Sequence, residues 1–277
     1  MSPGQYPAAE RVIVHFSDLH LAEGARALFG VVDADARLTA ALRQLVASGV
    51  EPAAIVVTGD VADAGAADGY RRARELLEPV AFELGAQLVW VPGNHDRRPE
   101  FRALLMDQEP SGDEVDGVHD LAGLRLLVLD TSVPGHNHGE VRDHQLEWLA
   151  EVLATPAARG TVLAMHHPPI PVVIAPSDEI ELHGQERLAA VLRGSDVRAI
   201  IAGHLHHATT SSFAGIPVSV AAASCYTVDP LGHDGWVRGQ DGGQAFNLVH
   251  LYADRVVHTV VPIGAFSTVY EFAPRDE

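Results

Sequence analysis

The chain has 277 residues, of which 47% are hydrophobic, and this length and composition suit one compact globular domain. Its formal net charge of −18 argues against a nucleic acid or an anionic membrane as the main partner. All of its cationic side chains are arginine, and the absence of lysine excludes a P-loop NTPase and a pyridoxal phosphate enzyme.

Cysteine usage and the first residues indicate the compartment. Cys225 is the single cysteine, so neither an internal disulfide nor a multi-thiolate zinc site can form, and we interpret it as a small buried hydrophobe. The start "MSPGQYPAAERVIVHF" lacks a basic segment followed by an apolar stretch, and no apolar run approaches the roughly 18 residues that span a bilayer. We therefore expect a cytoplasmic protein without a membrane span.

Short β-branched segments alternate with amphipathic stretches of helical length over the first two thirds of the chain. In the first helical stretch, Leu38, Ala41, Leu42 and Leu45 share one face. The expected strands are 11–16, 53–59, 87–91, 124–130, 161–166 and 197–203, and the expected helices are 33–48, 68–85 and 143–154. This alternation predicts an α/β sandwich with layered sheets and outer helices.

The pattern changes after residue 214, where strands at 216–226, 246–253 and 255–263 follow one another without a long helix. This segment should form antiparallel or mixed sheet. The long loops 131–142, 168–184 and 227–244 are typical of lids, binding loops or disordered segments. We expect one domain over residues 10–265, with flexible or peripheral termini at 1–9 and 266–277.

Polar side chains that bind metal ions follow five of the expected strands. After the first strand, Asp18 and His20 are two residues apart, so in an extended segment both point to the same side. After the second, Gly59 allows a sharp exit before Asp60, at the edge where open α/β sheets bind ligands. The complete set of candidate metal ligands is Asp18, His20, Asp60, Asn94, His166, His204 and His206.

Any one of these residues could instead cap a helix or form a turn, so the prediction depends on the whole ordered set. Carboxylate, amide and imidazole ligands without a thiolate suit Mn, Fe, Zn and similar ions. Seven ligands are too many for one tetrahedral site, but they fit two ions about 3.5 to 4 Å apart that share a carboxylate. Such a pair holds the attacking and leaving oxygens of an in-line phosphoryl displacement.

The ordered motifs D-x-H, G-D-x-x-D, G-N-H-D, H-H before proline and G-H-x-H resemble those of the calcineurin-like metallophosphoesterase superfamily. Longer stretches, including "LDTSVPGHNHGE", "HHPPIP" and "LRGSDVRAIIAGHLHH", are similar to the bacterial class III cyclic nucleotide phosphodiesterases. The resemblance covers roughly residues 10 to 265. It implies a four-layer α-β-β-α sandwich with two mixed β-sheets.

The resemblance also implies a role for each candidate ligand. One ion would be held by Asp18, His20, Asp60 and His206, and the other by Asp60, Asn94, His166 and His204. Asp60 would bridge the two ions, and a hydroxide that also bridges them would attack phosphorus. The implied ions are Fe³⁺ with Mn²⁺ or two Mn²⁺, with Zn²⁺ as an alternative.

Two residues next to these ligands are candidate catalytic residues. His95 follows Asn94 and can reach the phosphate without binding metal, so we predict that it protonates the leaving group or binds the phosphate. Asp63 is expected to orient His95, because a carboxylate commonly orients a catalytic imidazole, although it could instead be a helix N-cap. We expect Asp96 to cap the helix that begins near Pro99 or to hold a ligand histidine.

Substrate contacts are expected from Asn94, His95 and two histidines of the loop 131–142. His136 and His138 are predicted to line the pocket and touch phosphate or base, with a polar loop tip as the alternative. Asn137 stands where similar members often carry histidine, so we assign it no role. We expect His167 and His207 to support neighbouring ligands or to be exposed, and the remaining histidines to be structural: His15, His119, His144, His183, His233, His250 and His258.

The favoured function is a dinuclear-metal phosphodiesterase that converts cyclic nucleotides to nucleoside monophosphates. The resemblance suggests 3′,5′-cyclic AMP and also 2′,3′-cyclic nucleotides as substrates, and a homodimer as the assembly. The alternatives are a broader phosphodiesterase or phosphatase acting on other small phosphate esters, and a scaffold that has lost the metals. A nuclease of this class should carry a basic track, which a chain at −18 without lysine does not suit.

Overall fold

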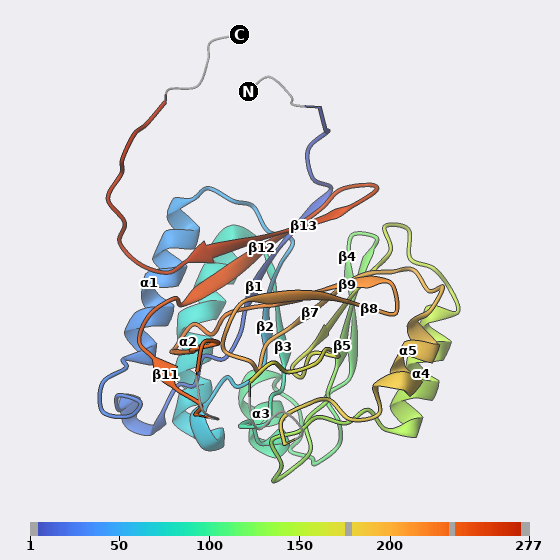
Figure 1. The fold of residues 1–277 in the computed structure, drawn as a ribbon, viewed down its shortest axis with the longest axis horizontal. Helices are drawn as coiled ribbons and strands as arrows, with labels where there is room; N and C mark the ends of the chain where they lie inside the picture. Colours follow the sequence, from blue (N-terminus) through green and yellow to red (C-terminus); the bar gives the residue numbers. More distant parts are fainter. Residues whose placement is uncertain (1–4, 175–178, 233–235, 273–277) are drawn as a thin grey trace.

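The computed structural model describes residues 5–174, 179–232 and 236–272. Two β-sheets pack face to face and helices cover their outer faces, which confirms the predicted four-layer sandwich (Figure 1). The first sheet has the strand order β13 (Val256–Pro262), β12 (Ala245–Leu251), β1 (Arg11–Phe16), β2 (Ala54–Thr58) and β3 (Gln87–Val91). The second has the order β4 (Gly117–Leu121), β5 (Leu124–Leu129), β6 (Thr161–Met165), β7 (Val197–Ala202), β9 (Ile216–Val220) and β8 (Thr209–Phe213).

Both sheets are mixed, as expected. In the first, β1, β2 and β3 are parallel, while β12 is antiparallel to β1 and β13 to β12. In the second, β5, β6, β7 and β9 are parallel and the edge strands β4 and β8 are antiparallel to their neighbours. The strands expected after residue 214 are therefore divided between the two sheets. A short ribbon of β10 (Thr227–Val228) and β11 (Gly239–Gln240) lies in the loop 227–244.

The helices belong to two layers. The helices α1 (Ala34–Ala47), α2 (Ala67–Leu84) and α3 (Arg98–Leu105) contribute to the core of the first sheet, and α4 (Asp143–Leu153) and α5 (Gln185–Leu192) to that of the second. Asp33 caps α1 by accepting a hydrogen bond from the Ala36 N–H, and α2 ends at Gly85 in a left-handed conformation. Two 3₁₀ turns, η1 (Glu23–Ala25) and η2 (Asp63–Gly65), follow β1 and β2.

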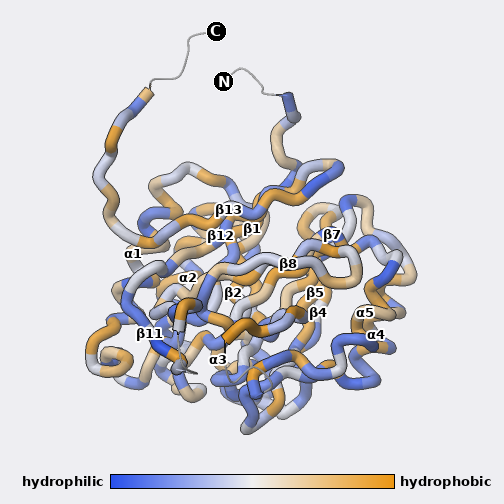
Figure 2. Tube along the Cα trace, viewed as in Figure 1, coloured by the Kyte–Doolittle hydropathy of each residue, from blue (hydrophilic) through white to orange (hydrophobic). Residues whose placement is uncertain are grey.

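The alternation of side chains along each strand divides the hydrophobic core into three parts. In β2, Ile55 and Val57 pack toward the helices, whereas Ala54 and Val56 pack between the sheets. The inner strands β1, β2, β5, β6 and β7 are accordingly buried over most of their length, and Figure 2 shows many hydrophilic residues in the outer loops. This packing fixes the relative position of the two sheets, and with it the position of the loops that follow their parallel strands.

Several short elements were not predicted. The edge strands β4 and β8 have exposed, largely polar residues, so they lack the buried β-branched run that marks the inner strands. The helix expected near Pro99 is α3, whereas α5, which follows the loop 168–184 and has only 8 residues, was missed. Short elements of this kind carry too few periodic positions to be recognised from hydrophobicity alone.

The described parts of the chain ends, 5–9 and 266–272, form neither helix nor strand, and Figure 1 shows both leaving the body on the side of β13. The remaining parts of the expected termini, 1–4 and 273–277, lie outside the described residues. The prediction of one domain over 10–265 stays a prediction. Within the described ranges, every helix is too short or too polar to cross a membrane.

Candidate metal centre

The loops that follow β1, β2, β3, β6 and β7 meet at one place and bring the seven predicted ligands together. Backbone hydrogen bonds join the first two loops, from Asp18 N–H to Gly59 O at 3.1 Å and from His20 N–H to Asp60 O at 2.9 Å. The His204 N–H donates to the Asp18 carboxylate at 3.0 Å, which ties the loop after β7 to the loop after β1. The loops of both sheets are thus held together by hydrogen bonds among the candidate ligands themselves.

Four side chains form one half of the group. The Nε2 atoms of His20 and His206 are 3.2 Å apart. His20 Nε2 lies 3.3 Å from Asp60 Oδ2, and His206 Nε2 lies 3.4 Å from Asp18 Oδ1. Donor-to-ion distances of about 2.0–2.2 Å give donor-to-donor separations of roughly 3.0–3.5 Å, so the four donors are spaced as ligands of one ion would be.

The second half is arranged around His166. Its Nε2 atom lies 3.0 Å from Asn94 Oδ1 and 3.5 Å from Asp60 Oδ2, and its ring centroid is 5.0 Å from that of His204. Asp60 Oδ2 therefore faces His20 on one side and His166 on the other. The other oxygen, Asp60 Oδ1, accepts the His95 N–H at 2.8 Å. A carboxylate held in this way presents one oxygen to both halves, as a bridging ligand does.

Backbone carbonyls fix the tautomers of three histidines, since a carbonyl can only accept a hydrogen bond. Nδ1 of His166 donates to Thr58 O at 2.7 Å and Nδ1 of His206 donates to Tyr226 O at 2.9 Å. Nε2 of His204 donates to Ile180 O at 2.8 Å. The remaining nitrogen of each neutral ring is free to bind an ion, and a hydrogen bond at the opposite nitrogen is the usual way of orienting a ligand histidine.

Charge in the group favours a cation. Burial lowers the pKa of His20, but hydrogen bonds and charges from Asp60 and Asp63 outweigh burial and raise it to about 10. Burial also lowers the pKa of His166, and the charge of Asp60 raises it to about 9. Burial and the charge of His166 lower the pKa of His204 to about 3. The buried carboxylates thus draw protons onto neighbouring imidazoles, and a divalent ion would replace these protons.

Five candidate ligands have a backbone conformation that L-residues rarely adopt. Their φ angles are positive: Asp18 52°, His20 46°, Asp60 51°, His204 73° and His206 57°. A non-glycine residue in this region costs on the order of 1–3 kcal/mol, and such strain concentrates at functional sites. The hydrogen bonds between the loops hold the backbone in this conformation, which turns the side chains toward one another.

Two glycines are required because these loops touch. A Cβ atom on Gly93 would lie 2.4 Å from Asp60 N and 2.2 Å from Asp60 Oδ1. One on Gly59, where φ is +96°, would lie 2.3 Å from His166 Nδ1. The glycines of the G-D and G-N-H motifs therefore permit the close approach of the ligands that follow them.

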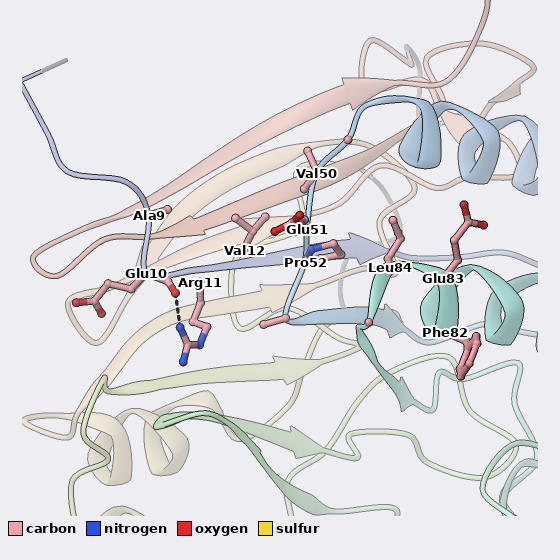
Figure 3. A pocket seen from close by; sticks show the side chains of 13 residues that line it. Ala9, Glu10, Arg11, Val12, Val50, Glu51, Pro52, Phe82, Glu83 and Leu84 are labelled. Atoms are coloured by element: carbon pink, nitrogen blue, oxygen red, sulfur yellow. Dashed lines mark hydrogen bonds between the residues drawn. The ribbon is translucent and has the colours of Figure 1, made fainter. Parts of the chain in front are cut away.

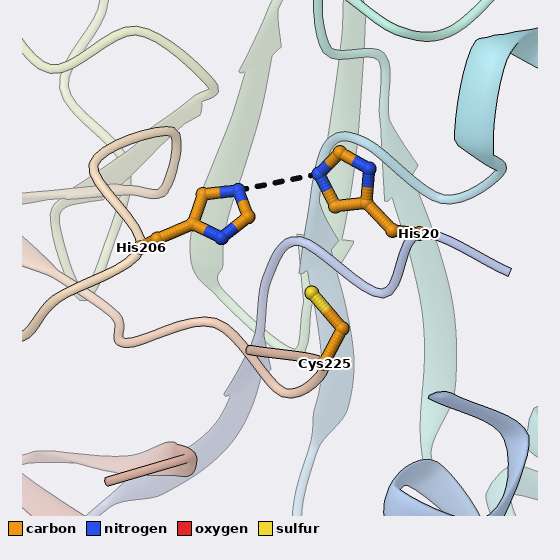
Figure 4. A group of neighbouring side chains, drawn as sticks. All are labelled: His20, His206 and Cys225. Atoms are coloured by element: carbon orange, nitrogen blue, oxygen red, sulfur yellow. Dashed lines mark hydrogen bonds between the residues drawn. The ribbon is translucent and has the colours of Figure 1, made fainter. Parts of the chain in front are cut away.

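Cys225 is the nearest sulfur to the group. One ligand atom each of His20, His206 and Cys225 lies within 4.8 Å of the others (Figure 4). This proximity was not foreseen, although the expected burial is confirmed. Burial, with the charge of Asp18 added, raises the pKa of the thiol well above its ordinary value. Without a metal ion the thiol is therefore protonated, and Asp18, His20, Asp60 and His206 already offer four donors to an ion in this half of the group.

Replacing Cys225 by alanine should accordingly leave the bound metal unchanged. The expected result is the same number of metal equivalents as in the unsubstituted protein, measured by elemental analysis after dialysis. Loss of one equivalent would instead make the sulfur a ligand. Circular dichroism would control for unfolding, because removal of a buried sulfur leaves a small cavity.

His95 and Asp63 lie at the edge of the group. Asp63 Oδ1 is 3.6 Å from His95 Nδ1 and 3.5 Å from His20 Nδ1. Hydrogen bonds from His20 and His95 lower the pKa of Asp63 well below its ordinary value, so it is ionised. It begins the turn η2 and caps no α-helix, since α2 has its N-cap at Ala66. The carboxylate contacts both histidines, and its predicted role in orienting His95 is consistent with this geometry.

The expectation for Asp96 was wrong. Its carboxylate accepts hydrogen bonds from the Gly93 N–H at 2.8 Å and from the Val61 N–H at 3.1 Å. The N-cap of α3 is Arg97, which has no side-chain cap bond. Asp96 therefore caps no helix; it joins the loop after β3 to the loop after β2, a tertiary contact that sequence spacing cannot reveal.

A cleft of about 630 Å³ opens beside the group. Its lining includes Asn94, His95, Arg97, His136 and Asn137. Of the histidines predicted to bind substrate, His95 and His136 thus face this space. His138 lies instead beside His183, with the two rings stacked at 4.2 Å.

A larger hollow of about 760 Å³ lies at the amino ends of β1 and β2, away from the candidate ligands (Figure 3). Its described lining includes Glu10, Arg11, Glu51 and Phe82 but none of the predicted site residues. Size alone therefore does not identify the functional site, because the chemistry lies at the carboxyl ends of the strands.

The contact of Tyr226 with the group was missed from the sequence. Its ring packs against His206 at 4.5 Å and His20 at 5.9 Å. His167 is buried and packs against His204 at 4.4 Å, in line with the expectation that it supports a neighbouring ligand. Its neighbour His166 and the pair His204 and His206 carried the sequence signal, whereas Tyr226 follows a strand with no motif of its own.

Comparisons with known proteins agree with the fold and the motifs. Residues 11–208 match the family model described as calcineurin-like phosphoesterase. The chain is 56% identical over 268 residues to a Mycobacterium tuberculosis protein named cAMP/cGMP dual specificity phosphodiesterase, covering 97% of this chain and 84% of that one. It is 52% identical over 274 residues to a Rhodococcus erythropolis protein named "Probable cyclic nucleotide phosphodiesterase", covering 99% and 90%.

Among solved structures, a dimetal phosphatase from Danio rerio superimposes with a TM-score of 0.66 over 92% of this chain and 97% of that chain. Their sequences are 16% identical, so this likeness concerns the fold alone.

Proposed function

The chain belongs to the calcineurin-like phosphoesterase family, and we propose that it is a dinuclear-metal phosphodiesterase that hydrolyses cyclic nucleotides to nucleoside monophosphates. The observation that carries the proposal is the convergence of seven oxygen and nitrogen donors from five strand ends, with Asp60 Oδ2 between two histidines. The relatives named as cyclic nucleotide phosphodiesterases, which align over nearly the whole chain, support the substrate class.

The donors fit two ions. We assign Asp18, His20, Asp60 and His206 to the first and Asp60, Asn94, His166 and His204 to the second. The chemistry supplied by two such ions is activation of water and neutralisation of the phosphate oxygens. The donor set supports Fe³⁺ with Mn²⁺ or two Mn²⁺, and it accepts Zn²⁺ as well.

The remaining steps depend on side chains of this chain. We assign to Asn94 the orientation of the phosphate, through an amide that faces the cleft. When the oxygen of water bonds to phosphorus and the bond from phosphorus to the ribose oxygen breaks, that oxygen needs a proton. His95 donates it from Nε2, while the ionised Asp63 near Nδ1 holds the ring in place. His136 lines the same cleft and is assigned to the substrate. His138, also predicted to touch the substrate, stacks on His183 and is not assigned to it.

Replacing Asn94 by alanine should reduce turnover by about 100-fold or more, because the second ion loses a ligand and the phosphate loses a contact. The measurement is kcat/KM for 3′,5′-cyclic AMP, together with the bound metal equivalents. Asn137→Ala is the matched control, since it removes an amide from the same cleft without removing an assigned ligand. It should keep the full metal content, and wild-type turnover in the Asn94 variant would contradict the ligand assignment.

The substrate class is tested by comparing esters under identical conditions. Protein loaded with Mn²⁺ should hydrolyse 3′,5′-cyclic AMP, 2′,3′-cyclic AMP and bis-nitrophenyl phosphate, and should act poorly on nitrophenyl phosphate. A preference for the monoester would favour a phosphatase acting on other small phosphate esters. Full metal binding without turnover of any ester would favour a scaffold.

We further infer a cytoplasmic protein that acts on a small substrate and not on a nucleic acid polymer, in line with its acidic charge. The homodimer implied by the family resemblance stays a prediction. Light scattering coupled to size exclusion gives the mass directly.

A further inference from the structure

Three side chains outside the proposed centre form a second group with the character of metal ligands. His138, Glu140 and His183 each offer one ligand atom, and these atoms lie within 4.8 Å of one another. We call this group the loop cluster. His138 Nε2 is 3.3 Å from Glu140 Oε1, and the rings of His138 and His183 stack with an interplanar angle of 14°. His183 was expected to be structural, because it lies more than 40 residues from the other two and shows no ligand spacing.

The backbone holds the two loops of the cluster side by side. Gly139 and Leu182 form an isolated parallel bridge. The Gly139 N–H donates to Glu181 O at 3.1 Å, and the His183 N–H donates to Gly139 O at 2.8 Å. A Cβ atom on Gly139 would lie 2.5 Å from His167 Cγ, so the loop 131–142 packs closely on the core at this point. His138, Glu140 and His183 therefore project from backbone positions that hydrogen bonds fix.

We propose that the loop cluster binds a third metal ion, a divalent transition metal of the Zn²⁺ type. Two imidazoles and one carboxylate, completed by water, are a set that zinc uses in proteins. The 3.3 Å between His138 Nε2 and Glu140 Oε1 matches the edge of a tetrahedron with bonds of about 2.0–2.1 Å. One ring nitrogen of His183 already lies within 4.8 Å of the ligand atoms of His138 and Glu140, so a change of its side-chain torsion would direct this nitrogen at the same ion.

An ion here would act on the proposed centre through the same two loops. Asn137 O lies 3.2 Å from His167 Nε2, and the His167 ring packs on His204 at 4.4 Å. The other loop supplies Ile180 O, which accepts the hydrogen bond of His204 Nε2. The loop cluster therefore joins the two segments that orient His204. The residues of the loop cluster are therefore positioning residues for His204. This role rests on the proposed function, whereas the binding of the third ion does not.

The test counts bound Zn²⁺ by equilibrium dialysis of metal-stripped protein followed by elemental analysis. The unsubstituted protein should bind three equivalents, and His183→Ala and Glu140→Gln should each bind two. His144→Ala is the matched control, because His144 is a histidine with 63% of its side chain exposed and lies outside the cluster. It should bind three equivalents. Thermal unfolding with and without the last equivalent should show a rise in Tm in the unsubstituted protein and in the control only.

The variant Asp60→Ala separates this proposal from the proposed function. It should keep one equivalent, and addition of Glu140→Gln should remove that one. Two equivalents in the unsubstituted protein, with the same two in His183→Ala, would overturn the third site and leave the two-metal centre standing. The opposite result is that the unsubstituted protein binds one equivalent, which Glu140→Gln loses and Asp60→Ala keeps. It would support the third site and contradict the two-metal centre. A raised KM for cyclic AMP in His183→Ala, with the Zn²⁺ count unchanged, would make the cluster a substrate contact and overturn the proposal.

Discussion

Replacing Asp60 by alanine is expected to lower kcat/KM for 3′,5′-cyclic AMP by about 1,000-fold or more. Asp60 Oδ2 lies 3.3 Å from His20 Nε2 and 3.5 Å from His166 Nε2, so removal of the carboxylate takes a ligand from both proposed ions. It also removes the acceptor of the His95 N–H, which fixes the loop that carries the proposed acid.

The measurement combines kinetics with metal analysis in saturating Mn²⁺. Asp254→Ala is the control, since it removes an exposed carboxylate between β12 and β13. It should keep wild-type turnover. An Asp60 variant that binds two ions of Mn²⁺ at the proposed centre and retains turnover would show that Asp60 does not bridge them. Circular dichroism separates loss of chemistry from loss of fold, because Asp60 is buried.

Replacing His95 by alanine should lower turnover of cyclic AMP by about 10²- to 10⁴-fold, because the ribose oxygen then leaves without a proton donor. Nitrophenolate leaves well without a proton, so the loss for bis-nitrophenyl phosphate should be much smaller. The variant should keep both metal ions, because His95 is not an assigned ligand and its ring lies against Asp63 and the edge of His20. The measurement is kcat for the two diesters in the same preparation.

Asp63→Asn provides the companion variant. It keeps the size of the side chain and removes the charge near His95 Nδ1. Turnover of cyclic AMP should therefore fall less than in His95→Ala, and turnover of bis-nitrophenyl phosphate should fall less than that of cyclic AMP. Equal losses of the two diesters in His95→Ala would mean that this histidine binds the phosphate and does not supply a proton.

The strands that carry the ligands could be predicted because they are buried on both faces. β2 reads AIVVT and is buried at every position, and the polar residue after such a run must lie at the end of a sheet. Parallel strands bring the residues that follow them to one edge of their own sheet, and the packing of the two sheets then brings Asp18 of one close to His206 of the other. The order of motifs gave the candidate ligands before any geometry was known.

What the sequence could not predict depends on contacts between loops. Asp96 is three residues from Gly93 and resembles a helix cap, but its oxygens accept the N–H groups of Val61 and Ala62. The positive φ of Asp18 and Asp60 has no local sequence cause such as glycine; it follows from hydrogen bonds made across the site. Neither a propensity nor a periodicity records a constraint that comes from another loop.

Cys225 and His183 illustrate the same limit. Each stands in a stretch without ligand spacing, and each reaches a histidine group only because the chain folds back from another strand. Cys225 follows β9, which pairs with β7, and the loop after β7 carries His206. His183 reaches His138 through the bridge between Gly139 and Leu182. Tertiary pairing of this kind brings ligands together without leaving a motif.

The most direct test of the two-metal account is a titration of metal-stripped protein with Mn²⁺, in which bound equivalents and hydrolysis of 3′,5′-cyclic AMP are measured on the same samples. Unsubstituted protein is titrated, and the Glu140→Gln variant is titrated in parallel, so that equivalents bound at the loop cluster can be distinguished from those bound at the proposed centre. The account predicts that activity is absent without metal and reaches its full value when two equivalents are bound. Full activity in stripped protein, or a maximum at one equivalent, would contradict it.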